Sequence, residues 1–208
     1  MTATVTELPA ATSQQVFRAV LDALARPGKI GLLPVPAGET RPAALLPLLA
    51  LADLSTPVHV LSDDPLWTGV VTSATGAPAV ALEDARLVAV LDPPDPARLR
   101  GLRTGSEFAP EEAAQLFVAV ADLAEHGDLT LSGPGVPGSR ELGVTGLPEG
   151  FWAVRAELVR GFPAGVDLVL VTADGRLAGV PRTTAVHNTA IHNTAIHNTG
   201  TQNTVEVR

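Results

Sequence analysis

Residues 162–184 read FPAGVDLVLVTADGRLAGVPRTT, and this stretch decides the fold class. Residues 168–171 are all apolar and half of them are β-branched, which is typical of a strand buried on both faces. Asp174 and Gly175 supply a turn, because Gly adopts positive φ freely and Asp tolerates it better than most residues. The chain returns through residues 176–180, and Pro181 ends the second strand because proline has no N–H for a ladder. The stretch therefore predicts a hairpin at or near the centre of a sheet.

The exit of this hairpin carries a guanidinium and two hydroxyls, from Arg182, Thr183 and Thr184. Because α/β proteins tend to place ligands at strand ends, these residues are candidate contacts for a ligand or a partner. Asp167, at the start of the first strand, is a further candidate because it could meet Arg182 across the hairpin. A structural ion pair is the more ordinary role for such a pair, and we favour it over a functional site.

The rest of the chain alternates helical and extended patterns, which indicates an α/β fold with helices on both sides of a mixed sheet. Thr12 or Ser13 can cap a first helix that ends at Arg26-Pro27-Gly28. The apolar stripe of this helix is formed by Val16, Phe17, Val20, Leu21 and Leu24. Further helices are expected at residues 42–53, near Trp67, up to Leu102 and at residues 148–160. Strands are expected at residues 30–35, 58–61, 85–91 and 129–132, and residues 114–123 are interpreted as strand although their period also allows a helix.

Composition narrows the class of protein. The chain has 208 residues, a net charge of −8, no Cys and a single Lys, Lys29. The acidic balance and the 3% aromatic content argue against nucleic-acid binding. No apolar window is long enough to span a bilayer and the N-terminus shows no secretory signal, so we expect a cytoplasmic protein without a membrane partner.

A glycine-rich stretch, Gly133-Pro134-Gly135-Val136-Pro137-Gly138, matches the dinucleotide pattern G-x-G-x-x-G. Pro134 and Pro137 remove two N–H groups that would bind phosphate, and no helical pattern follows directly. A turn that needs glycine conformations is the favoured interpretation. A backbone nest for one phosphate or phosphonate oxygen is the alternative, so Gly133 and Gly135 are candidate ligand contacts.

The end of the chain repeats a unit of the form Ala-Val/Ile-His-Asn-Thr from residue 185 onward. We expect one domain over residues 1–186 and a disordered low-complexity tail over residues 187–208. His187, His192 and His197 recur every five residues, which gathers metal ligands neither on a helix nor on a strand. We therefore predict no metal site.

Three motifs in this order resemble the PhnH family, the H subunits of the bacterial carbon–phosphorus lyase system. They are Leu131-Ser132-Gly133-Pro134-Gly135-Val136, Pro163-x-Gly165-Val166-Asp167-Leu168 and Pro181-Arg182-Thr183-Thr184, and the resemblance covers about residues 8–186. It implies a three-layer α/β/α fold with a mixed sheet, like that of pyridoxal-phosphate-dependent transferases but without the cofactor. The residues agree, because a pyridoxal enzyme needs a lysine for its Schiff base and Lys29 is expected to be solvated in a loop.

The same resemblance implies a subunit of the complex that makes α-D-ribose 1-methylphosphonate 5-triphosphate from ATP and methylphosphonate. In that family the H subunit works with subunits G, I and L, joins a core with G, I and J, and is a homodimer when free. The sequence shows no catalytic constellation of its own, so we expect an accessory subunit without catalytic residues or cofactors. The alternative is an enzyme subunit with its own phosphate or nucleotide pocket near Gly133, Gly135 and Arg182.

Overall fold

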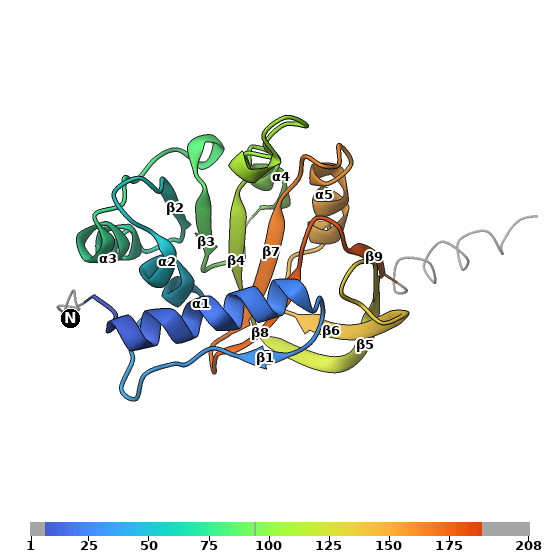
Figure 1. Ribbon diagram of the computed structural model, residues 1–208, viewed down its shortest axis with the longest axis horizontal. Helices are drawn as coiled ribbons and strands as arrows, with labels where there is room; N and C mark the ends of the chain where they lie inside the picture. Colours follow the sequence, from blue (N-terminus) through green and yellow to red (C-terminus); the bar gives the residue numbers. More distant parts are fainter. Residues whose placement is uncertain (1–6, 94, 189–208) are drawn as a thin grey trace, which may run out of the picture.

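The structure is a computed structural model that describes residues 7–93 and 95–188 (Figure 1). Its helices are α1 (Ala10–Ala25), η1 (Ala43–Leu45, a 3₁₀-helix), α2 (Leu46–Leu51), α3 (Leu66–Thr75), α4 (Pro96–Leu99) and α5 (Phe151–Leu158). Short 3₁₀ turns, η2 (Leu82–Asp84) and η3 (Pro110–Glu112), lie in the loops. Its strands are β1 (Gly31–Leu32), β2 (Val58–Leu61), β3 (Leu87–Val90), β4 (Gln115–Val120), β5 (Asp122–Ser132), β6 (Ser139–Thr145), β7 (Asp167–Thr172), β8 (Arg176–Val180) and β9 (Ala185–Asn188).

The main sheet has six strands in the order β1-β8-β7-β4-β3-β2 and is mixed, as predicted. Strands β2, β3, β4 and β7 run parallel, whereas β8 and β1 are antiparallel to their neighbours. The predicted hairpin is confirmed: β7 pairs with β8 from Leu168 opposite Val180 to Val171 opposite Leu177. Gly175 forms the turn with φ of +87°, a conformation that side chains disfavour.

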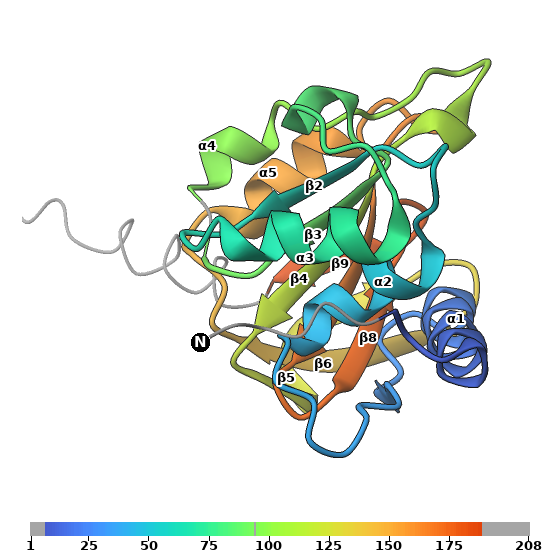
Figure 2. The ribbon, with the colours of Figure 1, turned by 90° about the vertical axis from the view of Figure 1, so that its left-hand side faces the viewer.

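The two faces of this sheet bury separate apolar clusters. Along β7, Val169 and Val171 contribute to one cluster, and Leu168 and Leu170 contribute to the other. Helices α1, α2 and α3 cover the first face, and α4 and α5 cover the second. Figure 2 shows α3 and α5 on either side of the edge strand β2. The uniformly apolar central strands predicted from the sequence are therefore explained by cover on both faces.

A second sheet lies beside α5 on the second face. It has three antiparallel strands in the order β6-β5-β9. Its apolar side chains join the second cluster through Leu123, Leu129, Leu131 and Leu142. The sequence predicted only the two ends of β5 and missed β6, because few side chains of these strands are buried: Leu123, Leu129 and Leu131 in β5 and Leu142 in β6. Residues 114–123 are strand rather than helix, as interpreted, but they divide between the two sheets.

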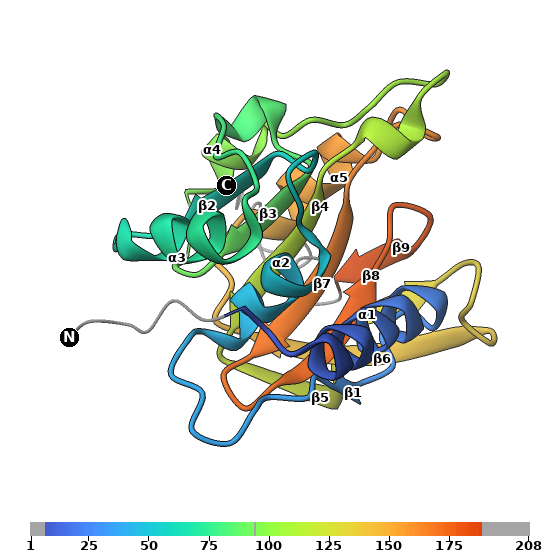
Figure 3. The ribbon, with the colours of Figure 1, turned by 60° about the vertical axis from the view of Figure 1, so that its left-hand side comes forward.

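The first helix differs from the prediction at its start and in its exposed face. It begins at Ala10 after Pro9, with no side-chain cap, so neither Thr12 nor Ser13 caps it. The stripe is wider than the core can cover: Val16 and Val20 are buried, whereas Phe17 and Leu21 are 50% and 55% exposed. Figures 1 and 3 show α1 lying across β8.

Two other predicted helices also differ from the structure. The helix expected at residues 42–53 is a 3₁₀ turn, η1, followed by the six-residue α2. Pro42 precedes η1, and Pro47 lies in the first turn of α2, where a proline costs no hydrogen bond. The helical turn expected near Trp67 is the ten-residue helix α3.

The predicted domain boundary at residue 186 falls inside β9. This strand pairs with β5, placing Thr130 opposite His187 and Leu129 opposite Asn188, so the first repeat unit joins the second sheet. Residues 189–208, with His192 and His197, lie outside the described residues. Within the described ranges, every helix is too short or too polar to cross a membrane.

Candidate functional site

Arg182 and Asp167 form a partly buried ion pair where the two strands of the hairpin end. The backbone N–H of Arg182 donates to Oδ1 of Asp167 at 2.7 Å, and Nη2 donates to Oδ2 at 2.7 Å. Nη1 donates to the carbonyl oxygens of Pro110 at 2.8 Å and Pro163 at 3.2 Å. The two side chains are only 14% and 24% exposed. The structural ion pair favoured from the sequence is therefore present, and most donors of Arg182 are used inside the protein.

The position of this pair corrects one expectation. Ligands of open α/β sheets bind beyond the carboxyl ends of the parallel strands. Because β8 is antiparallel to β7, the exit of β8 lies beside Asp167, the first residue of β7. Arg182 therefore lies at the amino ends of the parallel strands, the edge opposite to the usual ligand site.

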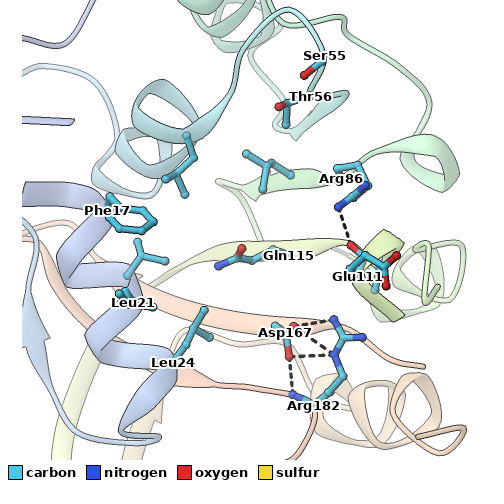
Figure 4. Close-up of a pocket in the computed structure, with 14 residues that line it drawn as sticks. Phe17, Leu21, Leu24, Ser55, Thr56, Arg86, Glu111, Gln115, Asp167 and Arg182 are labelled. Atoms are coloured by element: carbon cyan, nitrogen blue, oxygen red, sulfur yellow. Dashed lines mark hydrogen bonds and ion pairs between the residues drawn. The ribbon is translucent and has the colours of Figure 1, made fainter. Parts of the chain in front are cut away.

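A cavity of about 640 Å³, which we call the amino-end cavity, opens at this edge (Figure 4). Phe17, Leu21 and Leu24 of α1 form an apolar wall, and polar side chains lie across from them. Its other lining residues are Val20, Leu51, Ser55, Thr56, Arg86, Leu87, Glu111, Ala113, Gln115, Asp167 and Arg182. The cavity is thus amphipathic, with hydrogen-bonding groups on one side only.

Gln115, which lines this cavity, has a side-chain N–H donor that makes no hydrogen bond to the described residues. Its Nε2 is buried and has no hydrogen-bond partner within the part of the chain that the structure describes. Nearby, Nη2 of Arg86 donates to the carbonyl oxygen of Glu111 at 2.6 Å. A buried amide without a partner is costly, so Nε2 of Gln115 lowers the stability of the fold at this cavity.

A second cavity, of about 420 Å³, lies between α5 and the hairpin exit and is called here the α5 cavity. Its lining residues are Pro134, Arg155, Val159, Phe162, Arg182, Thr183, Thr184 and Ala185. It therefore brings the predicted hairpin exit next to the predicted glycine-rich turn. Thr183 is exposed, whereas Thr184 is buried with Oγ1 lacking a partner in the described ranges.

Two of the three glycines of the G-x-G-x-x-G match, Gly133 and Gly135, serve close backbone packing. Gly133 has φ of +126°, and a Cβ there would lie 2.8 Å from the carbonyl oxygen of Thr183. Gly135 has φ of +81°, and a Cβ there would lie 2.4 Å from the carbonyl oxygen of Ala25. The strand β6 follows rather than a helix, so the favoured turn interpretation is confirmed and a dinucleotide fingerprint is not formed.

Arg155 is the functional candidate that the sequence analysis missed. Only 5% of this residue of α5 is exposed, and its Nη2 donates to the carbonyl oxygen of Pro181 at 2.8 Å. Burial lowers the pKa of Arg155 to about 10, against the opposing effect of the Asp167 charge. A signal existed, because Arg155 follows Phe151 by four residues and so shares the buried face of the helix.

The residues do not fit a pyridoxal cofactor. Lys29 is exposed in the loop after α1 and lines a separate cavity with Glu125, His126 and Arg140. Neither cavity at Arg182 is lined by a lysine that could form a Schiff base. Within the described ranges, His, Asp and Glu do not form a cluster of three that could hold a metal ion.

Comparison with known proteins identifies the family. Residues 6–187 match the family described as bacterial phosphonate metabolism protein (PhnH). The chain is 34% identical to "Putative C-P lyase subunit protein HtxG" of Stutzerimonas stutzeri, over 84% of this chain and 85% of the relative. It is 32% identical to "Alpha-D-ribose 1-methylphosphonate 5-triphosphate synthase subunit PhnH" of Rhizobium meliloti (strain 1021), over 85% of this chain and 90% of the relative. The protein therefore belongs to the PhnH family, as its three motifs predicted.

Proposed function

We propose that this protein is a subunit of a carbon–phosphorus lyase assembly that acts in phosphonate catabolism. The observation that carries this proposal is its similarity, over most of both chains, to relatives named as subunits of that system. Within the assembly it contributes to making α-D-ribose 1-methylphosphonate 5-triphosphate, the product in the name of one relative. Its partners are the other subunits G, I, J and L, it is a homodimer when free, and it works in the cytoplasm.

The role is accessory rather than independently catalytic. Supporting this, the most prominent charged pair, Arg182 and Asp167, is engaged in closing the hairpin. The alternative, a phosphate- or nucleotide-binding enzyme subunit with a pocket near Gly133, Gly135 and Arg182, has less support. Both glycines are packed against backbone carbonyl groups, and the guanidinium already donates to Asp167 and two carbonyl oxygens. We also propose that the fold is related to that of pyridoxal-phosphate-dependent transferases and is used here without the cofactor.

Growth on a phosphonate tests this proposal. A host that carries the other lyase subunits but lacks its own H subunit is expected to grow on phosphate and not on methylphosphonate. Expression of this chain should restore growth on methylphosphonate, and the tagged chain should co-purify with the other subunits. Failure of both, from a chain that is soluble and folded in the host, would overturn the proposal.

A further inference from the structure

The region around the α5 cavity holds one more positive charge than it can neutralise. Arg155 and Arg182 lie near a single carboxylate, that of Asp167. Both oxygens of this carboxylate accept hydrogen bonds from Arg182. Arg155 forms no ion pair with any described acidic residue and donates only to a carbonyl oxygen. A buried cation is normally paired, so the counter-charge for Arg155 has to come from outside the part of the chain that the structure describes.

The free donors of the α5 cavity are few. Nη1 of Arg155 makes no hydrogen bond and is not sealed from solvent, and Thr183 offers an exposed hydroxyl. Pro134 has no N–H, and the Oγ1 of Thr184 is buried beyond the reach of a ligand. A phosphoryl group has three oxygens and usually requires several donors, whereas a carboxylate is satisfied by one or two. The donor count therefore favours a carboxylate.

The surroundings of Arg155 favour a protein as the source of that carboxylate. Phe162, in the lining of the same cavity, is 65% exposed, and Pro134 and Val159 add further apolar surface. An exposed aromatic ring beside a desolvated arginine is typical of the energetic centre of a protein interface. A small free anion would leave this apolar surface in water, whereas an apolar residue next to an Asp or Glu would cover it.

We propose that Arg155 and Phe162 anchor a docking surface for another subunit of the assembly, which inserts an acidic side chain flanked by apolar residues. This inference rests on the proposed function and adds the site and the chemistry of the contact. The net charge of −8 gives the chain no general attraction for acidic segments, so recognition depends on this local cation.

Two variants and a control test the surface in the full-length protein. Arg155→Met keeps the length of the side chain without its charge, Phe162→Ala removes the ring, and Arg98→Met changes an exposed arginine of α4. Each isolated variant is melted, and its affinity for the purified remaining subunits is measured. We expect melting temperatures within about 3 °C of wild type. We expect affinity to fall by about tenfold or more for the first two variants and to stay unchanged for the control.

The outcomes separate the inference from the proposed function. If wild type binds the other subunits and both test variants bind equally well, the docking surface is wrong and the proposed function stands. If wild type binds none of them, both are overturned. If Arg155→Met does not fold, Phe162→Ala decides, and its normal binding rejects the surface. Methylphosphonate and ATP are also titrated into the isolated protein. A rise in melting temperature that Arg155→Met abolishes would make the occupant a small phosphoryl anion instead of a protein.

Discussion

The carboxylate of Asp167 accepts hydrogen bonds from both the backbone N–H and the guanidinium of Arg182. The side chain of Asp167 therefore fixes the direction in which the chain leaves β8, and it also neutralises the positive charge of Arg182. The same guanidinium reaches the carbonyl oxygens of Pro110 and Pro163, which lie in two different loops. The pair thus joins the hairpin exit to the loops before β4 and before β7.

Replacing Arg182 should cost stability. We expect Arg182→Ala to lower the free energy of unfolding by about 3 kcal/mol, because Asp167 would keep its charge without its partner. Arg182→Lys should recover only part of this, since one ammonium cannot make the several directed bonds of the guanidinium. Urea unfolding measures both variants. The double variant Arg182→Ala/Asp167→Ala should cost less than the sum of the two single changes, and strict additivity would show that the pair is not coupled.

Gly133 and Gly138 form a matched pair for the glycine-rich turn. Both have positive φ, but a Cβ at Gly138 meets nothing within 4 Å, whereas one at Gly133 lies 2.8 Å from the carbonyl oxygen of Thr183. Gly138→Ala should cost about 1 kcal/mol for the backbone conformation. Gly133→Ala should cost about 1–3 kcal/mol more, because the added methyl group overlaps backbone atoms. Equal melting temperatures for the two variants would contradict this explanation of Gly133.

Two truncations test where the domain ends. Removal of residues 189–208 should change the melting temperature by less than about 2 °C, because the repeat offers little apolar surface to offset the backbone entropy of ordering it. Removal of residues 185–208 also deletes β9 and exposes the edge of β5 from Leu129 to Ser132. That variant should melt several degrees lower. A large loss from the shorter truncation would show that the repeat contributes to folding.

Gln115 provides a prediction of increased stability. Its buried Nε2 has no hydrogen-bond partner among the described residues, so an apolar side chain of similar length removes an unsatisfied donor. We expect Gln115→Met to raise the free energy of unfolding by about 1 kcal/mol. Chemical denaturation of the isolated protein measures the change. If the variant is less stable than wild type, the amide must have a partner in solution, most simply an ordered water.

Glu39 makes stability depend on acid pH. The side chain of Arg41 donates to both carboxylate oxygens, at 2.8 and 2.5 Å, and this holds the pKa of Glu39 below its ordinary value of 4.5. A lowered pKa in the folded protein stabilises it above pH 4.5, and that stabilisation is lost as the pH falls through the folded value. Glu39→Gln should therefore be less stable than wild type at pH 7, by about 1–2 kcal/mol. The difference should shrink steadily toward pH 3, and a difference independent of pH would exclude the ionised pair as its cause.

The local chemistry of the chain predicted the centre of the fold but not its periphery. The β7–β8 hairpin was predictable because an apolar run, an Asp-Gly turn and a terminal proline all agree there. β6 was not, because its exposed polar residues carry no period and its pairing with β5 is set by the turn at residues 133–138. The first helix starts before its predicted cap, directly after Pro9, whose ring fixes φ at the N-cap position at −55°.

The candidate site also has one part that the sequence predicts and other parts that it does not. The contact between Asp167 and Arg182 follows from hairpin register, which residue spacing can specify. The meeting of Gly133 with Thr183 joins two segments about fifty residues apart, and it follows from the pairing of β5 with β9, which places Ser132 opposite Ala185 and which residue spacing does not specify. Arg155 was not predicted because the position four residues after Phe151, on the buried face of the helix, is expected to hold an apolar residue. Its lack of a counter-charge can be seen only in the folded structure.

The contact between Gly179 and Ala23 gives the amino-end cavity one immobile side. A Cβ on Gly179 would lie 2.3 Å from the carbonyl oxygen of Ala23, so the backbone of α1 rests directly on the backbone of β8. The N–H of Gly28, just after the helix, also donates to the carbonyl oxygen of Gly179 at 2.9 Å. The α1 wall of the cavity, which carries Leu24, is therefore held in place by the sheet. Any change in the width of the cavity has to come from its opposite wall, where Ser55 and Thr56 lie in the loop between α2 and β2.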